Sequence, residues 1–232
     1  MSFEDYSFDA DSFSGVARLF PLPNLVVFPH IMQPLHLFEP RYRTMLEESL
    51  ETDRLIAMAN LAPGWESNYE GRPAVRQTAC LCRVATHCKT EKGTYNVLLL
   101  GLKRIRIARE LPPNKLFREA EVEPLDDVYP SENGSRRASL QCKLVEAFRR
   151  QLPSLPGGGE QLQQLLATDV PLGLLTDIVS YSMPLDQKIK EDLLAQPLPD
   201  LRALLLLECL GAKCSESAGR RAMEFPPPFS VN

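Results

Sequence analysis

Closely spaced prolines near the start of the chain restrict the secondary structure of residues 19–46, which read LFPLPNLVVFPHIMQPLHLFEPRYRTML. Proline has no amide hydrogen to donate to a sheet ladder, so it stands at strand ends, edges or bulges. Pro23 and Pro29 enclose residues 25–28, a β-branched run that is too short for a helix. A helical pattern then opens at Pro40, a residue suited to a first helical turn. The segment therefore predicts a strand, a corner, a second strand and a helix.

The chain continues mainly as strands to about residue 128. One helix is expected over residues 39–51, because apolar residues recur there at helical spacing. Residues 91–93, Glu-Lys-Gly between two apolar runs, indicate a hairpin turn. A loop over residues 62–73 contains prolines, glycines and the only tryptophan, Trp65. The expected strands cover residues 55–61, 78–87, 94–100, 103–108 and 116–124.

The apolar period changes from two to the helical value beyond about residue 131. Polar residues and glycine interrupt both patterns at residues 129–135, where we expect the boundary. Proline stands at or near the start of three later helices, at Pro171, Pro184 and Pro199. Gly211 is suited to end the last helix. The expected parts are an unstructured acidic segment over residues 1–15, a β domain over 16–130, a helical subdomain over 131–212 and a flexible tail over 213–232.

Charge is unevenly distributed. The 232 residues include 26 basic and 30 acidic ones, and four acidic residues precede the first basic residue, Arg18. The remaining 26 acidic residues balance the 26 basic ones, so the body is neutral. Neutrality disfavours a nucleic-acid partner, whose binding depends on phosphate neutralisation. Arg104 and Arg106 alternate with isoleucines, as in a strand with one solvated face, where we expect both arginines.

The sequence shows neither a membrane-spanning run nor a secretory leader. No apolar stretch has the length needed to cross a bilayer. Residues 1–13 contain no basic residue and no apolar signal-peptide core. We therefore expect a cytoplasmic protein with no membrane partner, and we expect its six cysteines to be free thiols.

No motif indicates catalysis. The chain has no G-x-x-x-x-G-K-[ST] phosphate loop, and no motif places a nucleophile beside any of its three histidines. Cys80 and Cys82 lie near His87 and Cys88, but C-x-C is not the spacing of a structural zinc site. On a strand the two cysteines would serve as small core residues. We expect no catalytic residue, no cofactor and no metal site.

The opening resembles the N-terminal domain of Lon proteases. In that family P-L-x-x-x-V-x-F-P is followed by P-L-x-L-F-E-x-R, and both patterns are met here within residues 21–41. The family's G-x-x-R-x-x-I is met by Gly101, Arg104 and Ile107. Residues 177–194 are similar to the segment that links the β domain of Lon to its ATPase, so the resemblance covers about residues 17–210. Gln77 departs from the pattern, since the family commonly has glycine there.

The resemblance implies an α+β fold, a PUA-like β pseudo-barrel followed by a C-terminal helical bundle. In Lon this region recognises unfolded or tagged substrates, helps hexamerisation and performs no chemistry. The ATPase domain and the Ser–Lys protease domain have no counterpart in these residues. We therefore expect a stand-alone, non-catalytic module that binds polypeptide segments or a protein partner, as an adaptor in protein quality control. A small-molecule enzyme and an RNA-binding PUA-like module are the alternatives, and the missing catalytic groups and neutral body disfavour them.

Four apolar residues are candidates for partner contacts: Phe28, Met32, Trp65 and Tyr69. Phe28 ends an apolar run, so the alternative is that it belongs to the core. For Trp65 the alternative is a lid over the barrel's own interior. The acidic and aromatic residues 1–13 could form a linear motif for a partner, or an unstructured terminus.

Overall fold

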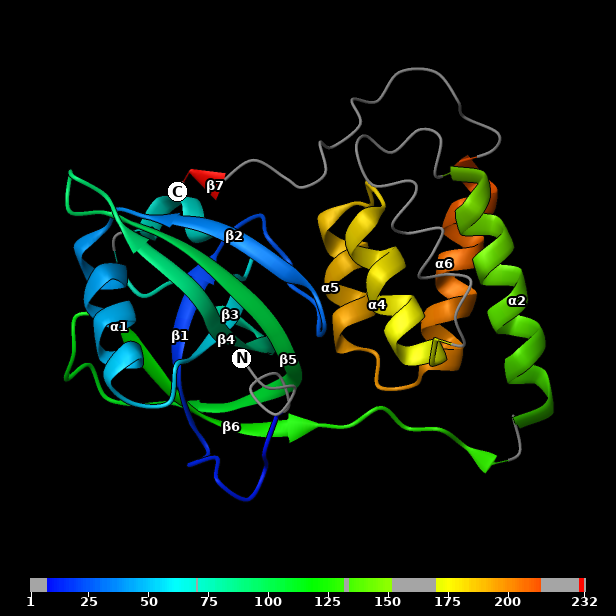
Figure 1. The fold of residues 1–232 in the computed structure, drawn as a ribbon, viewed down its shortest axis with the longest axis horizontal. Coiled ribbons are helices and arrows are strands. Elements are labelled where there is room, and N and C mark those ends of the chain that lie inside the picture. Colours follow the sequence, from blue (N-terminus) through cyan, green and yellow to red (C-terminus); the bar gives the residue numbers. More distant parts are fainter. Residues whose placement is uncertain (1–7, 70, 132–133, 152–169, 214–229, 232) are drawn as a thin grey trace. The chain divides into compact units, whose positions relative to one another are not determined.

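The computed structural model describes residues 8–69, 71–131, 134–151, 170–213 and 230–231 (Figure 1). The chain divides into two units, residues 1–126 with 229–232, and residues 127–228. This division assigns Asp127 and Tyr129 to the helical unit. The expectations for residues 1–7 and 214–229 lie outside the described residues. Residues 8–15 are described, and the rings of Phe8 and Phe13 meet edge to face with centroids 5.5 Å apart.

The first unit is a mixed sheet that closes on itself. Its strands are β1 (Val16–Leu22), β2 (Met32–Leu37), β3 (Leu55–Leu61), β4 (Val75–Lys89), β5 (Tyr95–Glu110), β6 (Arg118–Leu125) and β7 (Ser230–Val231). They pair in the order β4-β3-β1-β6-β5-β2-β7, and a further β4–β5 pairing closes the ring. Parallel pairing joins β1 to β3 and β2 to β7, and the other pairs are antiparallel. The expected α+β fold with a pseudo-barrel is confirmed.

The expected order of strand, corner, strand and helix is observed, with the corner between β1 and β2. Residues 25–28 are not part of the sheet, although Val26, Val27 and Phe28 are buried. The backbone there crosses β5 at Gly101, whose carbonyl accepts a hydrogen bond of 2.7 Å from the His30 amide. A Cβ at Gly101 would collide with the backbone carbonyl of Phe28, so only glycine permits this crossing. Burial of this apolar run therefore comes from the crossing and not from strand pairing.

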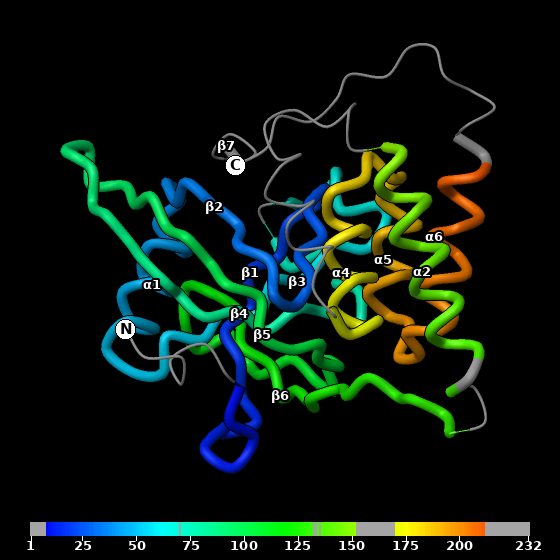
Figure 2. The backbone as a smooth tube through the Cα atoms, turned by 45° about the vertical axis from the view of Figure 1, so that its right-hand side comes forward, coloured from blue at the N-terminus to red at the C-terminus, as the bar shows by residue number. Residues whose placement is uncertain are grey.

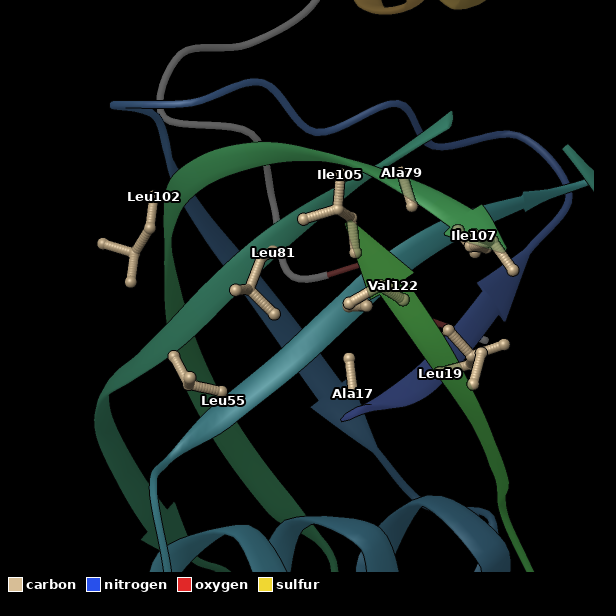
Figure 3. Packing of buried hydrophobic residues seen from close by; sticks show 12 residues of the cluster. Ala17, Leu19, Leu55, Ala79, Leu81, Leu102, Ile105, Ile107 and Val122 are labelled. Carbon is tan, nitrogen blue, oxygen red and sulfur yellow. The ribbon is translucent and has the colours of Figure 1, made fainter. Parts of the chain in front are cut away.

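The barrel interior is filled by aliphatic side chains. Figure 3 shows Leu81, Ile105 and Val122 among the buried residues between the strands. Each fully buried side chain of this size contributes about 1.5–3 kcal/mol relative to exposure. Arg104, expected on a solvated face, is only 4% exposed. Its strand pairs there with both neighbours, through Cys80 of β4 and Leu125 of β6.

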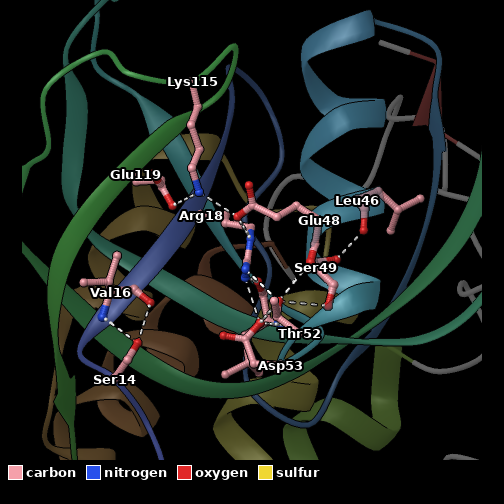
Figure 4. A network of polar contacts seen from close by, with 11 residues as sticks. Ser14, Val16, Arg18, Leu46, Glu48, Ser49, Thr52, Asp53, Lys115 and Glu119 are labelled. Carbon is pink, nitrogen blue, oxygen red and sulfur yellow. Dashed lines mark hydrogen bonds and ion pairs between the residues drawn. The ribbon is translucent and has the colours of Figure 1, made fainter.

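The helix α1 (Pro40–Glu51) is joined to β1 by a polar network. Figure 4 shows the Arg18 guanidinium among Glu48, Thr52 and Asp53. Its Nε donates to Glu48 Oε1 at 3.0 Å, and its Nη1 donates to Asp53 Oδ1 at 2.7 Å. Burial alone would raise the pKa of Glu48, but hydrogen bonds from Lys115 and Arg18 hold that pKa below its ordinary value. The network connects the end of α1 to the sheet.

The second unit is helical. Its described helices are α2 (Gly134–Gln151), α4 (Leu172–Ser182), α5 (Gln187–Ala195) and α6 (Pro199–Lys213). Helix α6 packs against both α2 and α4 (Figures 1 and 2). Two prolines lie at helix starts as expected, since Pro171 directly precedes α4 and Pro199 is the first residue of α6. Gly211 does not end the last helix, which continues to Lys213.

A buried arginine connects three parts of the helical unit. Arg202 of α6 is completely buried. Its Nη1 donates to Asp177 Oδ1 of α4 at 3.2 Å, and its Nη2 donates to Asp127 Oδ2 at 2.6 Å. The hydroxyl of Tyr129 accepts a hydrogen bond of 3.2 Å from the Gly173 amide. Residues 127–129 are therefore held on the helices by polar contacts. None of the described helices has the length and apolar character needed to cross a membrane.

Candidate functional site

Strand β2 lies near the end of the sheet order and has an outward edge. On one side it pairs with β5 along its whole length, from Met32 opposite Leu100 to Leu37 opposite Tyr95. On the other side, the described residues supply only the two-residue strand β7. A partly covered strand edge has main-chain donors and acceptors available to another extended segment.

The side chains of β2 alternate between the core and the surface. Gln33, Leu35 and Leu37 are buried, whereas Met32 is 44% exposed. Pro34 and His36 are half-buried, as expected for the opposite face of a pleated strand. Directly after the strand, Phe38 is 39% exposed. The outer side of β2 is therefore partly apolar.

His36 and Phe38 form a pair on this outer side. Their rings are stacked, with centroids 6.4 Å apart. Nδ1 of His36 lies 2.7 Å from the amide oxygen of Asn96 in β5, so Nδ1 is the donor. This hydrogen bond holds the imidazole and, through the stacking, orients the ring of Phe38.

An aromatic cluster lies just beyond the strand. The Tyr69 hydroxyl donates to Glu39 Oε1 at 3.0 Å, and the Arg41 guanidinium lies 5.2 Å from the centroid of the Tyr69 ring. Trp65 meets Tyr69 edge to face, with ring centroids 5.7 Å apart. Trp65 begins the 3₁₀ turn η2 (Trp65–Asn68), which follows Gly64 at a φ of 90°. Burial is the main cause that raises the pKa of Tyr69, and the hydrogen bond to Glu39 raises it further.

The structure separates the four residues that the sequence nominated. Phe28 has no exposed surface, so it belongs to the core and does not offer a partner contact in this conformation. Met32 lies at the start of β2, and Trp65 and Tyr69 belong to the cluster beside Glu39. Sequence reasoning missed Phe38. The signal was available, because inward-facing Leu35 and Leu37 place residues 36 and 38 on the outer face.

The described residues contain no cluster of three or more His, Cys, Asp and Glu side chains suited to a metal ion. Cys80 and Cys82 are completely buried, and burial raises the pKa of the Cys82 thiol. A buried thiol with a raised pKa is a poor nucleophile, because the thiolate is the reactive form. Cys80 and Cys82 therefore do not supply a reactive thiol at the surface.

Residues 16–211 match the sequence profile of the ATP-dependent protease La (LON) substrate-binding domain. The chain belongs to the family of Lon substrate-binding domains. Lon protease 2 of Desulfotalea psychrophila is 26% identical over 193 residues, which are 83% of this chain and 24% of that protein. Lon protease 1 of Bdellovibrio bacteriovorus is 25% identical over 198 residues, 85% of this chain and 24% of that protein. The chain thus spans about a quarter of the length of these Lon proteases.

Solved Lon domains share the fold. The N-terminal domain of a Mycobacterium avium complex Lon protease superposes with a TM-score of 0.66 at 12% identity, covering 84% of this chain and 98% of that one. The Lon N-terminal domain protein from Xanthomonas campestris superposes with a TM-score of 0.57 at 21% identity, and the match covers 83% of this chain and 97% of that one. The match is to the substrate-binding domain of Lon and not to its protease domain, so no catalytic domain is evident in these residues.

Proposed function

We propose that this Lon-type domain binds extended polypeptide segments along the outer edge of β2, without catalysis, as a recognition module in protein quality control. One observation carries the proposal: Ser230–Val231 pair in parallel with β2 at Leu35 and His36. The edge therefore has a geometry that an extended segment can occupy. The family assignment as a substrate-binding domain supports the same conclusion.

Strand addition suits a module that must accept many sequences. Main-chain hydrogen bonds provide affinity without reading side chains, and surface contacts on alternate residues add selectivity. The alternation on β2 offers such contacts, because Met32 and Phe38 are exposed while Leu35 and Leu37 hold the strand on the core. An unfolded chain presents both free backbone groups and apolar side chains, which is the combination this edge would select.

The direction of β7 indicates how a longer segment would continue. In the observed register the added strand runs parallel to β2, from Leu35 toward His36. A segment extended in the same direction would advance toward Phe38 and then toward Glu39, which contacts Tyr69. The cluster of Trp65 and Tyr69 would then contact the far end of the bound segment. Met32 would contact its near end.

Charge favours a polypeptide over a nucleic acid. Three of the four basic residues of β5 are paired with acids in or just after β6: Lys103 with Asp126, Arg106 with Glu123 and Arg109 with Glu121. Compensated cations contribute little to phosphate binding, because affinity there depends on release of counterions. We place this function in the cytoplasm, where free thiols such as those of Cys88 and Cys142 stay reduced.

The test is fluorescence anisotropy of the full chain with labelled β-casein, an unfolded polypeptide. The double variant Met32→Ser, Phe38→Ser removes the exposed apolar contacts of the edge and should weaken binding at least about tenfold, or about 1.4 kcal/mol. Leu116→Ser is the matched control, since Leu116 is 71% exposed in the same unit but lies outside β2. Equal affinity of the double variant and the wild type would contradict the proposal.

A further inference from the structure

The helical unit has a groove of its own, between α2 and α6. Its volume is about 360 Å³, and it opens to solvent. Its apolar lining comes from Leu140 of α2 with Leu201 and Leu204 of α6. Two of these leucines are unusually accessible, since Leu201 is 45% and Leu204 is 52% exposed. The groove is defined by α2 and α6 alone, so it belongs to this unit.

Helical spacing separates the groove from the core of the unit. On α2, Arg136, Leu140 and Lys143 recur at intervals of four and three residues and lie on one face. The neighbouring face of α2 carries Leu144 and Phe148, which are completely buried. Leu201 and Leu204 of the groove, by contrast, leave about half of their surface exposed. Their continued exposure has a cost that covering them would remove.

The rim of the groove carries two positive charges, those of Arg136 and Lys143. Arg136 and Lys143 lie one turn to either side of Leu140, and both side chains are exposed. No acidic side chain among the described residues forms an ion pair with either of them. Arg137 differs, because its Nε donates to Asp200 Oδ1 at 3.0 Å and its guanidinium lies 5.0 Å from the centre of the Tyr129 ring. Within the described residues, the apolar lining is thus flanked by two cations that form no ion pair.

We propose that the α2–α6 groove docks an acidic amphipathic helix from a protein partner. Apolar side chains on one face of that helix would cover Leu140, Leu201 and Leu204, and its Glu or Asp residues would meet Arg136 and Lys143. The partner segment is helical because α2 and α6 already satisfy their own backbone hydrogen bonds. An entering segment has to do the same, which a helix does internally. This surface is distinct from the β2 edge.

The probe is a fluorescein-labelled designed peptide of about 16 residues, or about four helical turns, with leucines at helical spacing and glutamates elsewhere. A second peptide keeps the leucines and replaces each glutamate with lysine. With the full chain at low salt, the glutamate peptide should bind at least about tenfold more tightly than the lysine peptide. Binding should also increase the helicity of the peptide, measured by circular dichroism.

Two variants address the two components of the groove. Leu204→Ser should weaken binding of the glutamate peptide at least about fivefold, since it removes most of one aliphatic contact. The double variant Arg136→Glu, Lys143→Glu should abolish the preference for the glutamate peptide or reverse it. Lys188→Glu is the matched control, an exposed lysine of α5 outside the groove, and it should bind as the wild type does.

Equal binding of both peptides, or identical affinities for wild type and Leu204→Ser, would overturn the proposal. Sedimentation velocity tests a second copy of this chain as the occupant: a dimer that Leu204→Ser dissociates, with no peptide bound, would overturn it too. Flotation with anionic phosphatidylserine vesicles tests a membrane as the occupant. Flotation that requires Leu204, without binding of the peptide, would also overturn the proposal. None of these results bears on β-casein binding at β2, so the two proposals fail separately.

Discussion

The two units leave apolar side chains exposed in different backbone settings. In the sheet unit, Met32 and Phe38 border a strand whose outer edge is covered, among the described residues, only by β7. In the helical unit, Leu201 and Leu204 project from a helix whose backbone is internally bonded. The first setting suits recognition through the main chain, which tolerates many sequences. The second suits recognition through side-chain pattern and charge, which selects a particular partner.

The units also differ in how they hold a buried arginine. Arg18 of the sheet unit pairs with Glu48 and Asp53, whose side chains are 30% and 39% exposed. Arg202 of the helical unit is completely buried, and its partner Asp177 is 2% exposed. Water screens the Arg18 pairs and reaches Asp127, whose side chain is 24% exposed, but it hardly reaches the Arg202–Asp177 pair. The same kind of contact should therefore matter far more to the helical unit.

The largest expected effect comes from removing an acid from the Arg202 site. Asp177→Ala leaves a buried guanidinium without one of its two carboxylates, which should lower the free energy of unfolding by about 3–5 kcal/mol. Urea denaturation followed by far-ultraviolet circular dichroism would measure the loss. A loss below about 1 kcal/mol is the size expected for an exposed ion pair, and it would contradict the proposed difference in stability contribution between the Arg202 and Arg18 sites.

The next effect concerns the strand that occupies the β2 edge. Deleting residues 230–232 removes β7, so a client no longer competes with the chain's own segment. The affinity for labelled β-casein should rise, about threefold or more, because the competent fraction increases. The affinity for the acidic helical peptide at the α2–α6 groove should stay the same. Equal gains at both surfaces, or no gain at β2, would contradict the separation of the two recognition modes.

A smaller effect is expected in the emission of Trp65, the only tryptophan. If the aromatic cluster contacts the far end of a bound segment, β-casein should shift the emission maximum to shorter wavelength and protect it from iodide quenching. Tyr69→Leu should reduce that response, since it removes the ring that Trp65 contacts. A signal that is already blue-shifted and quencher-resistant, and that ignores β-casein, would make Trp65 a lid over the barrel.

The smallest effect is the pH dependence of the Arg18 network. The pKa of Glu48 is held below its ordinary value by Lys115 and Arg18, against the effect of burial. Its stabilising contribution is therefore present above the unfolded pKa of about 4.3 and is lost as pH falls through the lower folded value. Because Glu48 is 30% exposed, the contribution should be under about 1 kcal/mol. Glu48→Gln should make the free energy of unfolding depend less on pH between about pH 5 and 3. Glu91→Gln is the control variant, and it should leave that pH dependence unchanged.

Local patterns predicted the elements that local chemistry determines. The strand over residues 55–61 matches β3, and the helix expected over 39–51 is α1 with Pro40 in its first turn. Residues 25–28, an apolar run too short for a helix, lie in the corner between β1 and β2, and no local pattern reveals that their burial comes from a crossing over Gly101. The pairing of β7 was also invisible, since two residues carry no period and their partner is far away in the sequence.

The candidate site was predictable to the extent that it depends on alternation. Met32 is exposed, and Trp65 contacts Tyr69, although no pattern in the sequence links these two aromatic residues. Phe28 was a candidate for a partner contact, with the core as the alternative, and in the structure it lies in the core. The groove between α2 and α6 could not be predicted, because the sequence reveals one apolar face per helix and does not show which leucines the other helices cover.

Hydrogen exchange of the β2 backbone tests the proposed polypeptide edge most directly. The variant without residues 230–232 is exchanged in D₂O with and without saturating β-casein, and peptides spanning residues 29–38 are followed by mass spectrometry. Bound polypeptide should slow exchange of outward-facing amides in β2, while peptides from α2 remain unchanged. Unchanged exchange in β2 together with protection elsewhere, under conditions where β-casein is demonstrably bound, would contradict the account.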